Sequence, residues 1–284
     1  MKLLIEHNGG LGDAIIDTAF IKKLKEKHPE YEIDLFTYFD NAEIFYDAGY
    51  LNTIIPAPKN YNHIHIGDQL KNKYDKHICI TGLLGWAFFT KQKTLFQQRS
   101  ELYNVDASPD DMEILLDNDK LPDNILNDFN TIIVFSAPKN QSFQSGKTIH
   151  KEVWEQIFDT YKDLAFLQIG TKDYDIEFDK RDNVIDLMDQ ISIRQALSTI
   201  PLATFIIGCD NFLNHASRVF KKRGVFLWGA NDPKQYGWDQ NINLYNKKHC
   251  SPCLTSHSDH TCCFAGGIDN IPFNEIKKAI DELK

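Results

Sequence analysis

Short apolar runs alternate along the first part of this chain with a segment whose apolar residues recur every three or four positions. The runs are KLLIEH (2–7), EIDLFTY (32–38), NTIIP (52–56) and KHICITG (76–82). The segment between the first two runs, near 13–28, has its apolar residues at helical spacing: Ile15, Ile16, Ala19, Phe20 and Leu24. His28-Pro29 ends it. The pattern predicts strands joined through helices.

A second and more regular series begins near residue 131. Its expected strands are TIIVFS (131–136), AFLQIG (165–170), NVIDL (183–187), TFIIGCD (204–210) and GVFLWG (224–229). Its expected helices cover 150–162, 192–200, 212–220 and 272–284. Because these strands are short, almost wholly apolar and joined through helices, they predict parallel sheets that are covered on both faces.

Two series of this kind predict an α/β protein made of two Rossmann-like, doubly wound domains. We place the first domain at 1–125 and the second at 126–270, with a closing helix at 271–284 and the linker within the polar stretch 117–130. Open α/β sheets bind ligands at the carboxyl ends of their strands, so polar residues at those ends are the first candidates for a site.

Composition narrows the class of protein. The chain has 284 residues, 42% of them hydrophobic and 25% charged, as expected of a packed globular protein. The net charge of −9 argues against nucleic acid as a partner, because phosphate binding needs a basic face. No apolar run is long enough to span a membrane, and Glu6 and His7 interrupt the first one, unlike a signal peptide. We therefore expect a cytoplasmic protein with at most peripheral membrane contact.

The loop NGGLGDAII (8–16) stands where the first strand should turn into a helix. Three functions for Asp13 are compatible with it: a helix cap, a ribose ligand of a dinucleotide site, or a catalytic base. A dinucleotide site would use Asp34 or Asp40 as its ribose partner, but a carboxylate at Asp13 would repel the pyrophosphate. Glycines in such a loop leave backbone space that a substrate could occupy.

Four stretches, in the same order along the chain, resemble glycosyltransferase family 9, the ADP-heptose:lipopolysaccharide heptosyltransferases and their relatives. They are GLGDAIIDTAFIKKLKEKHP (10–29), GKTIHKEVWEQI (146–157), IIGCDNFLNHASRVFKKRGVFLWGANDP (206–233) and CSPC (250–253) with the paired cysteines that follow it. The resemblance implies the GT-B architecture, in which two Rossmann-like domains face each other across a cleft. It also implies an inverting transfer of a sugar, a heptose in that family, from a nucleoside diphosphate to an acceptor hydroxyl.

The resemblance further implies roles for particular residues. Asp13 would be the catalytic base and Lys147 would stabilise the departing diphosphate, without a metal ion for this step. Residues expected to contact the nucleotide sugar are Gly10, Gly12, Ser136, Lys139, Gly170, Asp173, Asp210, Asn211 and His215, with Asp175 as an alternative to Asp173. The sequence departs from the family at Asn211 and Phe212, where the family has Ser or Thr and then glycine.

The domain roles and partners follow from the same likeness. The first domain would bind the acceptor, which could be a glycan, a lipopolysaccharide core or a protein. The second domain would bind the nucleotide-sugar donor, ADP-heptose or a similar compound.

The segment HCSPCLTSHSDHTCC (249–263) gathers four of the six cysteines. Cys250 and Cys253 have the spacing that lets two sulfurs reach one ion, and Cys262 with Cys263 could complete a tetrahedral zinc or iron site of structural type. Free thiols or an oxidation-sensitive pair are the alternatives. Cys79 and Cys209 lie inside expected strands and read as small core residues.

Two other functions stay open at this point. A nicotinamide-dependent oxidoreductase would bind its nucleotide at the first glycine loop. A non-catalytic binding or redox module would use the cysteine segment as its functional part.

Overall fold

The computed structural model describes residues 1–58, 69–70, 72–80, 93–116, 130–139, 147–229, 231–247, 268 and 271–284. The chain divides into two compact units, Met1–Asp117 and Asn118–Lys284. The domain boundary that the sequence placed at residue 125 lies outside the described residues and stays a prediction.

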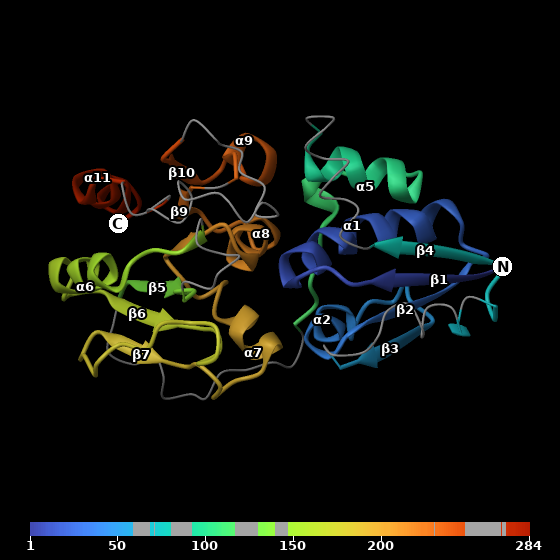
Figure 1. The fold of residues 1–284 in the computed structure, drawn as a ribbon, viewed down its shortest axis with the longest axis horizontal. Helices are drawn as coiled ribbons and strands as arrows, with labels where there is room; N and C mark the ends of the chain where they lie inside the picture. The colour runs from blue at the N-terminus through green and yellow to red at the C-terminus, as the bar shows by residue number, and fades with distance from the viewer. Residues whose placement is uncertain are drawn as a thin grey trace, which may run out of the picture. The chain divides into compact units, whose positions relative to one another are not determined.

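The first unit contains a four-stranded parallel sheet (Figure 1). Its strands are β1 (Lys2–His7), β2 (Glu32–Tyr38), β3 (Thr53–Ala57) and β4 (Lys76–Ile80), in the spatial order β3-β2-β1-β4. All three pairings are parallel. The four strands expected from the apolar runs are therefore all present, and the buried β1 lies between two partners.

The helices of this unit are α1 (Leu11–Lys27), α2 (Phe39–Ala42), η1 (Glu43–Phe45), α5 (Leu95–Tyr103) and η2 (Pro109–Asp111). Every side chain of α1 from Ala14 to Ile21 is buried, so this helix has protein on more than one side. Phe20 accounts for part of that burial, because its ring packs on Phe96 and Tyr103 of α5. The apolar pattern did not predict α5, and this helix proves important for the site.

The second unit contains a six-stranded sheet in the order β10-β9-β8-β5-β6-β7 (Figure 1). Its strands are β5 (Ile132–Phe135), β6 (Ala165–Gln168), β7 (Val184–Asp186), β8 (Phe205–Cys209), β9 (Gly224–Trp228) and β10 (Ile242–Tyr245). All five pairings are parallel. The sequence predicted all of these strands except β10.

Helices cover both faces of this second sheet. The helices of this unit are α6 (Lys151–Thr160), α7 (Ile193–Ser198), α8 (Phe212–Val219), α9 (Pro233–Tyr236) and α11 (Phe273–Leu283). Side chains on one face of the sheet, such as Phe135 of β5 and Phe205 of β8, form one core with Trp154 of α6 and Ile276 of α11. Helix α8 packs on β8 and β9 and contributes nothing to that core, which places it on the opposite face. The unit is doubly wound, as predicted.

Among the helices that the structure describes, none combines the length and the apolar character needed to cross a lipid bilayer.

Candidate functional site

Asp13 lies in the first turn of α1, just after the end of β1. The N-cap of α1 is Gly10 rather than Asp13. Asp13, the third residue of the helix, satisfies the helix start from inside it, because its Oδ2 accepts a hydrogen bond from the backbone N–H of Gly10 at 3.2 Å. A Cβ at Gly9 would lie 2.7 Å from the Cβ of Asp13. The missing side chain at Gly9 therefore makes room for Asp13 itself, rather than for a ligand as the sequence suggested. Gly12 belongs to the same turn of the helix.

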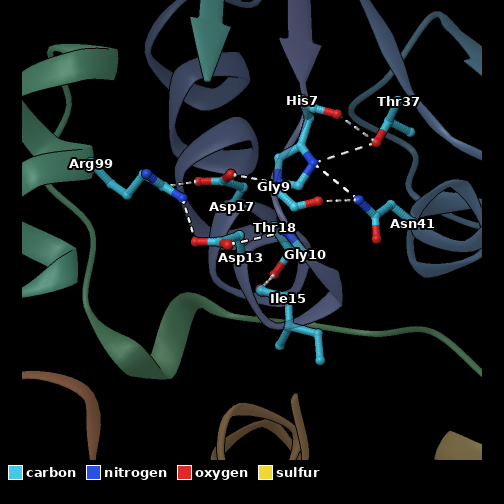
Figure 2. A network of polar contacts seen from close by, with 10 residues as sticks. All are labelled: His7, Gly9, Gly10, Asp13, Ile15, Asp17, Thr18, Thr37, Asn41 and Arg99. Carbon is cyan, nitrogen blue, oxygen red and sulfur yellow. Dashed lines mark hydrogen bonds and ion pairs between the residues drawn. The ribbon is translucent and has the colours of Figure 1, made fainter. Parts of the chain in front are cut away.

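Arg99 of α5 holds the other oxygen of Asp13 (Figure 2). Its guanidinium donates from Nη2 to Asp13 Oδ1 at 2.8 Å and from Nε to Asp17 Oδ1 at 2.6 Å. Asp17 lies one turn after Asp13 on α1. The side chains of Arg99 and Asp17 are 1% and 0% exposed, whereas that of Asp13 is 38% exposed. One buried cation thus bridges a buried carboxylate and a carboxylate that reaches solvent.

The contacts continue from Asp17 to the end of β1. Asp17 Oδ2 lies 3.1 Å from Nε2 of the buried His7, close enough for an ion pair but without hydrogen-bond geometry. Nδ1 of His7 faces Asn41 Nδ2 at 3.3 Å, and Asn41 donates to the carbonyl of Gly9 at 2.8 Å. We call Asn41, His7, Asp17, Arg99 and Asp13 the Asp13 network. It ties both sides of the glycine loop to one chain of polar groups that is buried everywhere except at Asp13 (Figure 2).

The charges within the Asp13 network explain how an arginine can be buried there. Burial by itself lowers the pKa of Arg99, but Asp17 and Asp13 outweigh it, so that the pKa is raised and the guanidinium stays protonated. A carboxylate held by a cation and a backbone N–H is fixed in orientation and is a weak base toward an ordinary alcohol. It can accept a proton from a hydroxyl that becomes acidic late in a reaction.

In the second unit, several of the predicted site residues meet at the carboxyl ends of β5, β6 and β8, which are neighbours in the sheet. Ser136 follows β5 and donates its hydroxyl to Asp175 Oδ1 at 2.9 Å. Asn211 follows β8 and places Nδ2 at 3.5 Å from the same hydroxyl. Asp175 Oδ2 in turn accepts from the backbone N–H of Thr171 at 3.1 Å. Ser136 thus connects all three strand ends.

Lys147 and Asp210 form an ion pair at the same edge, with 3.0 Å between Nζ and Oδ2. Asp210 is 7% exposed at its side chain, and it also accepts from Asn231 Nδ2 at 2.5 Å. Asn211 caps α8 by accepting from the N–H of Leu213 at 3.0 Å. Asp210 therefore does not cap this helix, and its carboxylate is available to orient Lys147.

The remaining predicted residues lie near this edge in different surroundings. Asp173 is exposed, whereas Asp175 is buried, and burial raises the pKa of Asp175 against the opposing hydrogen bonds from Thr171 and Ser136. Lys139 donates its ammonium to the carbonyl of Lys172. His215 is buried one turn into α8, with its ring edge-on to Trp238 at 5.7 Å.

A substitution at Gly170 tests how closely the residues at the carboxyl ends of β5, β6 and β8 are packed. Its φ is +139°, and a Cβ there would lie 2.2 Å from Asp175 Oδ2. We expect Gly170→Ala to lower the free energy of unfolding by about 2 kcal/mol or more, because it combines backbone strain with a clash against a hydrogen-bonded carboxylate. Urea unfolding measures this loss. Gly49→Ala is the matched control, since a Cβ at Gly49 meets nothing within 4 Å, and an equal loss there would contradict the explanation.

The cysteine segment lies outside the described residues, and so do Cys250, Cys253, Cys262 and Cys263. The two described cysteines differ in their surroundings. Cys209 is fully buried, and burial raises the pKa of its thiol, which fits a core residue. Cys79 is only partly buried.

Sequence reasoning missed most of the Asp13 network. Asp17 could have been noticed, because an aspartate among Ala14, Ile15, Ile16, Ala19 and Phe20 is unusual on a buried helix. Arg99 is 82 residues away from Asp17 in the chain, and no local pattern connects the two. Asn231 of the second unit was likewise not singled out.

The fold is similar to several solved structures of sugar-transferring enzymes. The glycosyl transferase family 9 protein from Veillonella parvula superposes with a TM-score of 0.72 at 13% sequence identity, covering 99% of this chain and 96% of that one. The E. coli heptosyltransferase WaaC, solved with ADP, gives a TM-score of 0.65 at 14% identity over the full length of both chains. The resemblance to this family is thereby confirmed at the level of fold, and so is the GT-B type of α/β fold, with one parallel sheet in each unit.

A third similar structure is the dodecameric iron-containing heptosyltransferase TibC in complex with ADP-D-beta-D-heptose. Its TM-score is 0.71 at 11% identity, covering 99% of this chain and 75% of TibC. The TibC protein comes from enterotoxigenic E. coli. No family sequence model and no curated protein sequence matches the chain.

Proposed function

We propose that this protein is an inverting glycosyltransferase that moves a sugar, a heptose in the first instance, from a nucleoside diphosphate to an acceptor hydroxyl. The observation that carries the proposal is Asp13, a partly exposed carboxylate at the carboxyl end of β1 that the buried Arg99 holds in one orientation. A second support is the match in fold to enzymes solved with ADP or ADP-heptose.

In this reaction the acceptor oxygen forms a bond to the anomeric carbon of the donor on the face opposite the diphosphate. The bond from that carbon to the diphosphate oxygen breaks, and its electron pair leaves with the nucleoside diphosphate. Asp13 takes the acceptor proton. Because Asp13 is ion-paired, we assign the proton transfer to a late stage, when attack on an oxocarbenium-like carbon has acidified the hydroxyl.

The departing diphosphate needs positive charge and N–H donors, and the second unit offers both. Lys147 is a compact cation that Asp210 holds at 3.0 Å. The N-terminus of α8 follows directly after Asp210 and Asn211, and the first N–H groups of a helix suit a phosphate. Phe212 replaces the family glycine at the first position of this helix, so we place the diphosphate on the Lys147 side rather than over residue 212.

A nicotinamide-dependent oxidoreductase is the alternative for which the glycine loop was considered. The carboxylate of Asp13 lies against the backbone of Gly9 and Gly10, where the pyrophosphate of a dinucleotide would have to sit. Negative charge at that position disfavours such a ligand. We therefore assign the nucleotide to the second unit instead.

Thermal stabilisation by nucleotides tests this assignment. We expect ADP or UDP to raise the melting temperature and NAD to leave it unchanged, because a ligand stabilises the state that it binds. Lys147→Gln should remove most of the shift, since it removes the cation from the diphosphate site. Lys162→Gln, at an exposed position of the same unit, is the matched control. A shift that NAD produces, or that survives Lys147→Gln, would contradict the proposed donor site.

For the cysteine segment we propose a structural zinc or iron ion bound by Cys250, Cys253, Cys262 and Cys263. Four thiolates are a donor set that suits either metal in tetrahedral geometry, and TibC is an iron-containing enzyme of similar fold. The ion would hold the segment together and take no part in the transfer. Elemental analysis of the purified protein, compared with a variant in which all four are serine, decides whether it is bound.

The acceptor is proposed to be a glycan, a lipopolysaccharide core or a protein, and the compartment to be the cytoplasm, where nucleotide sugars are made. A screen of purified protein against nucleotide-sugar donors, with release of nucleoside diphosphate as the readout, identifies the donor before acceptors are tried.

A further inference from the structure

Three potential metal ligands come together on one face of the first sheet, away from the Asp13 network. Strands β1 and β4 are parallel neighbours in which Glu6 pairs with Cys79 and Leu4 pairs with His77. Because side chains alternate between the two faces of a strand, Glu6, His77 and Cys79 share one face. His7 points to the other face, where it meets Asp17 of α1.

The donor atoms of the three side chains lie within 4.8 Å of one another. The carboxylate Oε2 of Glu6 is 3.1 Å from His77 Nε2. In a tetrahedral zinc site with the usual bond lengths, neighbouring ligand atoms are roughly 3.3–3.8 Å apart. Side-chain movements of about an ångström or less would therefore bring all three atoms to bonding distance from one ion.

The chemistry of these ligands selects the kind of metal. Imidazole and thiolate favour zinc and related transition metals over magnesium or calcium, and a carboxylate is compatible with zinc. A deprotonated Cys79 and an ionised Glu6 would together neutralise a dication. That matters because the side chain of Glu6 is only 4% exposed, and a dication would balance the charge of an ionised carboxylate at such a position.

The surroundings of Glu6 resemble those of a metal-bound carboxylate. Its second oxygen, Oε1, accepts from Asn8 Nδ2 at 3.0 Å, which would leave Oε2 to face the ion. Asn8 is also bound to β4 through its backbone N–H, which donates to Ile80 O at 3.1 Å. Outer hydrogen bonds of this kind orient metal ligands. An ion at this position would lock β1 to β4 immediately before the loop that carries Asp13.

We propose that Glu6, His77 and Cys79 form a binding site for a zinc-type divalent cation, in addition to and independent of the proposed sugar transfer. Three protein ligands leave the fourth position of a tetrahedral zinc ion to water or another group. The competing explanation is a plain hydrogen bond between Glu6 and His77 beside a thiol of the sheet. The two explanations make different predictions for zinc binding.

The experiment uses the full-length, chelator-treated protein with reduced thiols. Equilibrium dialysis against zinc should give one equivalent more for the wild type than for His77→Gln or Cys79→Ser, whereas His28→Gln, a partly exposed histidine of the same unit, should match the wild type. His77 is 24% exposed at its side chain and Cys79→Ser changes a single atom, so both variants are expected to fold. Cys250, Cys253, Cys262 and Cys263 are unchanged in all of these proteins, so any zinc that they bind cancels in the comparison.

Alkylation of the wild type followed by peptide mapping gives a second readout at the thiol itself. Zinc at ten times its dissociation constant should slow the modification of Cys79 by roughly tenfold, because only the zinc-free protein reacts. His77→Gln should abolish this protection. Equal zinc stoichiometry in the wild type and both site variants would overturn the proposal, and so would protection of Cys79 that persists without His77. Neither result would affect the proposed transferase function, which the nucleotide experiment tests separately.

Discussion

Asp13→Asn is expected to lower turnover by roughly 10² to 10⁴-fold, the usual contribution of a general base. The substitution keeps the size of the side chain and an oxygen for the N–H of Gly10, but it removes the carboxylate that we propose takes the proton from the acceptor hydroxyl. Release of nucleoside diphosphate in the presence of an acceptor measures the loss. Nucleotide binding, followed by thermal shift, should be unchanged because the diphosphate is assigned to the second unit.

Stability has to be followed in the same experiment, because Asp13→Asn also breaks an ion pair with Arg99. We expect a loss of about 1 kcal/mol or less, since Asp13 is 38% exposed and Arg99 keeps Asp17 as its partner. Asp47→Asn makes the same chemical change at an exposed position of the same unit and should alter neither property. Turnover that survives Asp13→Asn would show that the base is a different residue.

Arg99→Met is expected to cause the largest loss of stability, about 3–5 kcal/mol in the free energy of unfolding. The guanidinium is the cation that compensates Asp17, whose side chain is 0% exposed. Removing one partner of a buried ion pair leaves the other partner charged without its counter-ion. The resulting loss in the free energy of unfolding is larger than the contribution of the intact pair. Urea unfolding measures the change. Arg99→Lys is the milder variant, in which one ammonium replaces a guanidinium that contacts two carboxylates at once.

A double substitution shows whether the buried charge of Asp17 causes the loss of stability expected of Arg99→Met. Arg99→Met combined with Asp17→Asn should recover part of the lost stability, because the buried carboxylate that Arg99 compensates is then gone as well. Arg181→Met is the control, since Arg181 pairs with Asp159 near the surface and such pairs contribute about 1 kcal/mol or less. If the double variant is as unstable as the sum of the single variants, lost packing rather than charge explains the effect.

All described strands except β10, and all described α-helices of six or more residues except α5, could be predicted from the sequence because their signals are local. The run KLLIEH and the spacing of Ile15, Ile16, Ala19 and Phe20 define β1 and α1 without any information from elsewhere in the chain. Parallel pairing followed in turn from the helices between the strands. The polar residues at the carboxyl ends of the strands of the second sheet could also be predicted, because Ser136 and Asp210 directly follow apolar strands.

Helix α5 was missed even though a local signal for it existed. Thr94 accepts from the N–H of Gln97, and Gln97 reaches back to the N–H of Thr94, which is a capping box with the pattern Thr-x-x-Gln. The helix itself is polar, with the sequence LFQQRSELY, so no apolar stripe indicated a helix here. Its buried side chains are Gln98, Arg99 and Tyr103, and Tyr103 packs with the partly buried Phe96 on Phe20 of a distant helix.

The sequence by itself determined the two strand–helix series, the place of Asp13 at the end of β1, and the likeness to glycosyltransferase family 9 that the fold confirms. Only the tertiary structure decided that Arg99 holds Asp13, that Glu6, His77 and Cys79 meet on one face, and that Asn211 rather than Asp210 caps α8. The physical reason is one of distance along the chain. Backbone conformation follows from neighbouring residues, whereas the orientation and charge of a side chain depend on groups that folding brings from far away.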